Sequence, residues 1–120
     1  MKITTMLLAA AFSLGAGLGL ADTKGMQSMA DDSIKPFMVP MDAMMSAIPM
    51  MSTGKPDADF LLMMIPHHQS AIDMAQVELK LGKDHPTRVM AQQIIDAQKT
   101  EIATMRLMLQ AMGVTPPPAN

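Results

Sequence analysis

Apolar residues recur with the period of an amphipathic helix in three stretches of the chain, 41–48, 57–81 and 84–112. The apolar face of the first stretch comprises Met41, Met44, Met45 and Ile48. Asp57 is a good N-cap for the second stretch, and Asp84 takes the same place before the third. The pattern therefore predicts three helices, of which the first is the shortest.

The connections between these stretches predict how the helices pack. Only residues 82–84 separate the second helix from the third, so the two are expected to pack antiparallel as a hairpin. The loop 49–56 similarly folds the first helix back onto the second. Pro66 lies inside the second helix and is expected to kink it just before His67. We therefore predict an all-α fold, a small helical bundle made of a long antiparallel hairpin and a short N-terminal helix.

The chain begins with the features of a secretory signal peptide. Lys2 supplies a positive charge, residues 6–20 form a nearly unbroken apolar run, and small residues precede a cleavage position after Ala21. The run is short for a membrane span. We therefore expect residues 1–21 to be removed and the protein to be exported to the periplasm.

Behind the signal peptide the chain divides into a leader, one domain and a tail. Residues 22–36 mix polar residues with Met without apolar periodicity, which predicts a flexible leader. Residues 37–113 hold the three helices and form the single domain. Residues 114–120 include three consecutive prolines and are expected to form an extended tail.

Composition and missing motifs narrow the function classes. The formal net charge is −2 at pH 7, so the chain offers no basic surface for nucleic acid. No second apolar stretch is long enough to cross a bilayer, and no membrane association is expected after cleavage. The chain has no Cys and therefore no thiolate. A nucleophile elbow, a phosphate loop and paired catalytic carboxylates are all missing, so we do not expect an enzyme.

Methionine is the unusual feature of the composition. The chain contains 17 Met, of which only Met1 and Met6 fall in the signal peptide, and its aromatic residues are three Phe. Methionine is flexible and specifies a packed core poorly, so a chain built for packing alone would rarely use it this often. A function that needs thioethers is the simpler explanation.

Methionine and histidine come together in the second helix. Met63 and Met64 precede His67 and His68 by about one helical turn, and Met74 lies one heptad beyond His67. Thioethers and imidazoles thus follow one side of this helix. His67 and His68 are about 100° apart around the axis, so one metal site and two neighbouring sites are equally consistent with the spacing.

The predicted hairpin supplies further ligands. Glu101 and Met105 of the third helix are expected to approach His67 and Met64. The first helix is expected to add Met41, Met44 and Met45. For Gln98 and Glu101, orienting an imidazole is as good an interpretation as direct metal binding.

Thioether sulfur is a soft ligand that suits Cu(I), and imidazole suits copper in both oxidation states. A cluster of Met and His without Cys therefore favours copper over zinc or a hard cation. The alternative is that a Met stripe at helical spacing is simply core, and we expect this of Met90, Met108 and Met112. His85, near a helix start, is expected to be solvated.

The segment 57–75, which reads DADFLLMMIPHHQSAIDMA, closely resembles the hallmark of the CopM-like family, also known as domain of unknown function 305. The stretch from Ile94 to Met105 is similar to the family's second signature, Gln-x-x-Glu-Ile-x-x-Met. The resemblance covers about residues 37–112. It implies a ferritin-like helical bundle, export to the periplasm, and a link to copper binding and resistance.

The resemblance also implies a ligand set. Its members are Met64, His67, His68, Met74 and Met105, with Glu101 in support. Relatives often carry a Met–His pair in the first helix, whereas this chain has only Met there, which favours Cu(I).

Three hypotheses follow. The first is a non-catalytic periplasmic copper-binding protein, a scavenger, buffer or carrier that exchanges copper ions with copper-export or copper-carrier proteins. The second is a helical interaction module whose Met stripes form a homodimer or partner interface. The third, a sacrificial sink for oxidants, requires Met exposed over the surface, whereas the stripes are predicted to face inward.

Overall fold

A computed structural model describes residues 23–118 of the protein, with side chains from Asp32 onward. It contains three helices, α1 (Thr23–Ala47), α2 (Pro56–Leu81) and α3 (His85–Ala111), and no strand within the described residues. The predicted all-α fold is confirmed. The predicted signal peptide, residues 1–21, lies outside the described residues. None of the described helices combines the length and the apolar character that a membrane span requires.

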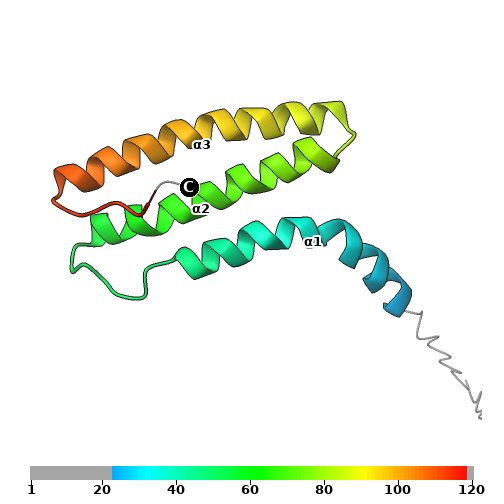
Figure 1. Cartoon of the computed structure of the whole chain (residues 1–120), viewed down its shortest axis with the longest axis horizontal. Coiled ribbons are helices and arrows are strands. Elements are labelled where there is room, and N and C mark those ends of the chain that lie inside the picture. The colour runs from blue at the N-terminus through cyan, green and yellow to red at the C-terminus, as the bar shows by residue number, and fades with distance from the viewer. Residues whose placement is uncertain (1–22, 119–120) are drawn as a thin grey trace, which may run out of the picture.

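The first helix starts much earlier than predicted. We expected a flexible leader over 22–36 and a helix from Met41, but α1 is already helical at Thr23 and continues through Pro36 and Pro40. Each proline removes a backbone hydrogen bond, and the ribbon of α1 changes direction partway along its length (Figure 1). Pro40 is buried, and Pro36 and Pro40 face the Val77 region of α2 across a shared groove. Packing against α2 thus stabilises a helix in a segment whose prolines disfavour one.

The two ends of the α2–α3 connection are held by side chains, as the short loop requires. Asp84 is the N-cap of α3, as predicted, and its carboxylate accepts a hydrogen bond from the backbone N–H of Thr87 at 2.9 Å. The guanidinium of Arg88 donates to the carbonyl oxygens of Leu79 and Gly82 at the end of α2. The predicted antiparallel hairpin is confirmed, and α2 continues through the buried Pro66 to its predicted end at Leu81.

At the start of α2 the predicted N-cap is wrong. Lys55 holds the N-cap position without a capping side-chain bond, and Asp57 lies inside the first turn. Proline at the first helical position takes the place of a cap because its missing N–H would be unpaired there in any case. The Lys55 ammonium instead donates to the carbonyl oxygen of Met112 at 3.1 Å and ties the start of α2 to the end of α3.

A single line of side chains joins α2 to α3, and we call it the seam. On α2 it alternates steps of three and four residues, and on α3 it does the same, which is the spacing of packed antiparallel helices. Its positions are Ala58, Leu61, Ile65, His68, Ile72 and Ala75 on α2, and Ala91, Ile95, Gln98, Ile102, Met105 and Leu109 on α3. All are apolar except His68 and Gln98, which lie between the two buried apolar clusters, while Ile102 packs against both.

The inward face of α3 differs from the one predicted. Met90 and Met108, expected in the core, are 61% and 45% exposed. Met112 does pack against the core, as expected. The prediction was wrong for Met90 and Met108 because Met and Leu or Ile follow one another along α3, and the apolar pattern alone does not choose between adjacent stripes.

The three helices form one layer with α2 in the middle (Figure 1). Within the described residues α2 packs against both neighbours, while α1 and α3 do not approach each other. After α3 the chain turns at Gly113, whose positive φ of 73° is the conformation that favours glycine at a helix end. The tail then runs back toward α2 and is held where Arg106 donates to the Pro117 carbonyl oxygen.

Candidate metal site

His68 occupies the middle of the seam, between the two apolar clusters. Helical spacing places it in line with Ile65, three residues before it, and Ile72, four residues after it, both of which are buried. Its side chain is 12% exposed. A polar ring therefore stands where the pattern of α2 calls for an apolar side chain.

Both nitrogens of the His68 ring face hydrogen-bond acceptors. Nδ1 lies 2.9 Å from the backbone carbonyl oxygen of Met64, and Nε2 lies 2.8 Å from Oε2 of Glu101 on α3. A neutral imidazole carries one N–H and one lone pair, so it cannot donate to both. The arrangement is satisfied when a cation, either a proton or a metal ion, lies between Nε2 and the Glu101 carboxylate.

Gln98 completes this polar layer from α3. Its side-chain amide donates to Oε2 of Glu101 at 3.3 Å, the same oxygen that faces His68. Glu101 itself reaches in from the edge of the hairpin, with 55% of its side chain exposed. The interpretation of Gln98 and Glu101 as polar partners that orient an imidazole thus agrees with the geometry, and the approach of Glu101 across the hairpin is confirmed with His68 in place of His67.

Two thioethers lie next to the polar layer, on the side toward the loop between α1 and α2. Met105, 8% exposed, belongs to the cluster formed with Leu109, and Met64 packs against that cluster from α2. Met64 is one turn before His68, and Met105 is one turn beyond Glu101. An imidazole and a carboxylate therefore lie in the polar layer, with two thioethers about one helical turn away on the same hairpin.

The other predicted ligands of α2 point elsewhere. His67 is exposed, and its ring centroid is 6.0 Å from that of His68 with the planes tilted by 60°. Met74 is half-buried and packs against neither apolar cluster. His85 is exposed at the start of α3, as expected.

The methionines of α1 lie away from the polar layer. Met41 and Met45 are 42% and 64% exposed, and Met44 is half-buried. The part of α1 near Ala43 lines a groove with Asp73 and later residues of α2, more than one turn beyond His68. Because α1 does not approach α3, the structure does not bring these three thioethers together with Glu101 or Met105.

Met63 belongs to a different part of the surface. It is 51% exposed and lines a hollow with two methionines of the loop between α1 and α2, Met50 and Met51. These two residues lie outside the helical periodicity and were not predicted as ligands. The signal that could have found them is a Met–Met pair next to Pro49 in a loop, where packing does not call for apolar side chains.

Exposure of methionine is general in the described part of the chain. Eight methionines are at least 40% exposed, namely Met38, Met41, Met45, Met50, Met51, Met63, Met90 and Met108. The expectation that the Met stripes face inward is therefore wrong. The oxidant-sink hypothesis requires methionines exposed at the surface, so the observed exposure no longer counts against it.

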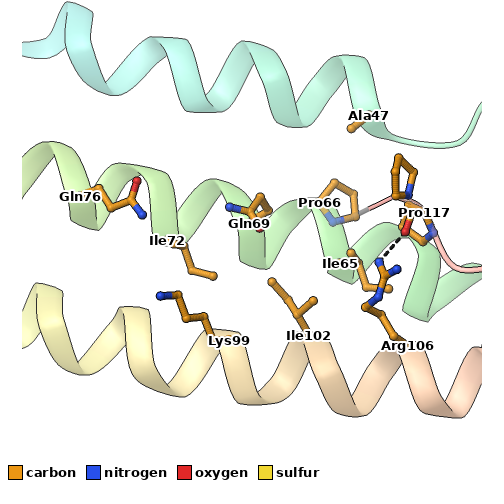
Figure 2. Close-up of a pocket in the computed structure, with 11 residues that line it drawn as sticks. Ala47, Ile65, Pro66, Gln69, Ile72, Gln76, Lys99, Ile102, Arg106 and Pro117 are labelled. Carbon is orange, nitrogen blue, oxygen red and sulfur yellow. Dashed lines mark hydrogen bonds between the residues drawn. The ribbon is translucent and has the colours of Figure 1, made fainter. Parts of the chain in front are cut away.

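A larger cavity of about 590 Å³ lies beside the seam and is lined by residues of all three helices and the tail (Figure 2). Pro66 and Ile65 form part of its wall, with Lys99 and Arg106 of α3 opposite, and the tail closes one end through Pro117. The buried Pro66 thus lines this cavity together with Ala47 of α1 and Pro117 of the tail. No His and no Met lines this cavity, so it is not part of the candidate metal site.

Nowhere in the described part of the chain do three or more His, Cys, Asp or Glu side chains gather as a metal-binding group would. A metal site at His68 would therefore need thioether ligands as well as His68 and Glu101.

Comparison with known proteins places the chain in a family but not in a functional class. No curated protein matches it, and no solved structure matches it. Residues 8–109, most of the chain, match the family described as Domain of unknown function (DUF305). The protein belongs to this DUF305 family.

Proposed function

We propose that this protein binds copper as its cargo at the polar layer of the α2–α3 hairpin. The observation that carries the proposal is His68, a nearly buried imidazole whose two nitrogens both face acceptors, with the Glu101 carboxylate 2.8 Å from Nε2. Copper would lie between Nε2 of His68 and the Glu101 carboxylate. Met64 and Met105 are the thioethers available to complete the site.

The donor set favours copper over other ions. One imidazole and two thioethers are soft or borderline ligands, and thioethers in particular suit Cu(I). The single carboxylate supplies one negative charge, which matches a monovalent ion. Zinc and hard divalent ions prefer thiolates, several imidazoles or several oxygens.

The biological setting is part of the same proposal. The apolar run at residues 6–20 and the absence of Cys suit an exported protein of an oxidising compartment such as the periplasm. No catalytic group is invoked: the protein would scavenge, buffer or carry copper and exchange it with export or carrier proteins. It would do no chemistry of its own.

The test is an anaerobic competition of the protein with a chromophoric Cu(I) chelator, repeated with Cu(II). The absence of Trp and Tyr keeps the optical signal of the chelator clean. We expect binding at a fixed stoichiometry that is weakened in His68→Ala and Glu101→Gln. His85→Ala is the matched control because His85 is exposed at the far end of the hairpin, and it should bind as the unaltered protein does.

The predicted roles of His67 and His68 can be separated in the same assay. Since His67 is exposed and lies outside the polar layer, His67→Ala should cost less affinity than His68→Ala. Equal affinities in the unaltered protein, His68→Ala and Glu101→Gln would exclude this site.

A second candidate function is an interaction module, favoured by the exposed apolar surface of α1. Among the described side chains of α1, from Asp32 onward, the large exposed apolar residues are Ile34, Met38, Val39, Met41 and Met45. Large exposed apolar patches are rare on monomeric proteins and often mark interaction sites. The flexible side chain of Met adapts to varied partners. This function predicts a homodimer, seen by sedimentation, that dissociates on Met38→Lys and Met45→Lys and does not respond to copper or chelator. A monomer at all concentrations would count against self-association.

A further inference from the structure

The loop between α1 and α2 carries a hollow that is separate from the polar layer. The hollow has a volume of about 210 Å³ and is lined by Met50, Met51 and Met63 together with neighbours of the loop and α2. Met50 and Met51 are 95% and 85% exposed, and Met63 is 51% exposed. Three thioethers thus share one small concavity at the surface, although keeping large apolar side chains in water is unfavourable.

This part of the loop is held in place by Asp59. Its Oδ1 accepts hydrogen bonds from the backbone N–H and the hydroxyl of Thr53, both at 2.7 Å, and its Oδ2 accepts one from the Ser52 hydroxyl. The Ser52 hydroxyl also accepts from the N–H of Gly54 at 3.0 Å. The loop residues that follow Met51 are therefore anchored to the first turn of α2, one turn before Met63.

The same bonds determine which donors the hollow can offer. Both oxygens of the Asp59 carboxylate are already engaged, and these hydrogen bonds, that of Ser52 first, lower the pKa of the group below its ordinary value. Asp59 therefore contributes a nearby negative charge and not a free ligand. The remaining donors of the hollow are three neutral thioether sulfurs without any imidazole.

Neutral soft donors select a soft ion of low charge. A divalent ion such as Zn²⁺ gains little from thioethers compared with water, whereas Cu(I) and Ag(I) prefer them. Because the thioethers carry no charge and Asp59 supplies a single negative charge nearby, a monovalent ion also leaves less charge uncompensated than a divalent one.

We infer that Met50, Met51 and Met63 form a second metal site, made of thioethers alone, that takes a soft monovalent cation of the Cu(I) class. The site is exposed at the surface, so its ion is open to exchange with solvent or with another protein. It shares no residue with the polar layer at His68 and does not depend on it.

The test uses Ag(I), which is soft, monovalent and inert to redox change, and the protein labelled with carbon-13 in its methionine methyl groups. We expect the methyl signals of Met50, Met51 and Met63 to shift together and to saturate at one equivalent. The variant Met50→Leu/Met51→Leu should lose that equivalent. Since Met and Leu have similar volumes and both positions are exposed, the fold should persist, which circular dichroism would verify.

The matched control is Met90→Leu/Met108→Leu, which removes two exposed methionines of α3. It should retain the equivalent. Asp59→Asn, which loosens the loop without removing a ligand, should weaken the binding and preserve its stoichiometry. Unchanged binding in Met50→Leu/Met51→Leu, or shifts spread over all exposed methionines without saturation, would overturn the inference.

The variant His68→Ala separates this inference from the proposed function. With His68 absent, the shifts of Met50, Met51 and Met63 should persist. If they vanish with His68→Ala, the thioether site is not independent. If they persist while copper binding at the polar layer proves absent, only the proposed function fails.

Discussion

His68 and Gln98 are the two polar residues in a seam of otherwise apolar side chains. A polar group in such a position is tolerated when its hydrogen bonds are made, and here His68 bonds to Met64 and Glu101. Buried polar pairs are nevertheless often no more stable than apolar side chains of similar size. We therefore expect the hairpin to be less stable with His68 at this position than with an apolar side chain of similar size.

This difference in stability predicts the effect of His68→Leu. The leucine would extend the apolar line between Ile65 and Ile72, while the half-exposed Glu101 returns to water. We expect the free energy of unfolding to rise by about 1 kcal/mol, measured by chemical denaturation without metal. Copper affinity at the polar layer should fall in the same variant.

The control for this exchange is His67→Leu. Because His67 is exposed, its replacement should leave the free energy of unfolding nearly unchanged. A lower free energy of unfolding in His68→Leu would mean that the polar layer stabilises the hairpin, contrary to this prediction.

Asp59 makes stability depend on pH through the loop. Its pKa is lowered in the folded protein by hydrogen bonds from Ser52 and Thr53, so its contribution is fully present above the ordinary carboxyl pKa. The contribution is lost as the pH falls through the lowered value, because protonation removes an acceptor. Thermal unfolding should therefore show a steeper loss of stability in acid for the unaltered protein than for Asp59→Asn.

Asp57 is the matched control, since it lies in the same first turn of α2 and makes no such bonds to the loop. The variant Asp57→Asn should follow the unaltered protein through the acid range. If all three proteins lose stability in parallel, the loop contacts of Asp59 are not the source of the pH dependence.

Among the elements, α2 and α3 depend on each other most. Leu109 is fully buried among Ala58, Leu61, Ile65 and Met105 at the open end of the hairpin, away from the 82–84 connection. Removing its side chain leaves a cavity that the helices cannot fully close, so Leu109→Ala should lower the free energy of unfolding by about 2–5 kcal/mol. Chemical denaturation measures this loss.

A second leucine of α3 provides the comparison. Leu107 is 66% exposed two residues earlier, and Leu107→Ala should change stability by less than about 0.5 kcal/mol. Similar losses at the two positions would mean that the buried face of α3 differs from the seam described above.

At the scale of the whole molecule, the single layer of helices decides which residues can meet. With α2 in the middle, α1 and α3 do not pack directly against each other in the described part of the chain, and the α1 residue that shares a cavity with α3 is Ala47, not a methionine. The triple variant Met41→Leu/Met44→Leu/Met45→Leu should therefore keep the copper affinity of the polar layer. Met64→Leu/Met105→Leu should weaken Cu(I) binding in the same competition assay, and the opposite ranking would place the site on α1.

Much of the hairpin could be predicted without coordinates. The short connection 82–84, the N-cap at Asp84 and the apolar period of the two long helices are local features, and local features determine helix type and direction. The approach of Glu101 to the His67–His68 region followed from the same loop length. The register was accurate to about one residue, which was enough to name the pair but not to choose between the two histidines.

The tertiary structure decided what local pattern cannot. Pro36 and Pro40 oppose a helix by themselves, and only burial against α2 makes α1 continuous through them. Which stripe of a Met-rich helix faces inward depends on the partner it packs against, so Met90 and Met108 could not be placed from sequence. Chain order and periodicity thus determined α2, α3 and the donor types. Packing between helices decided the extent of α1 and which donors meet, because contacts distant in sequence depend on the shapes of both faces.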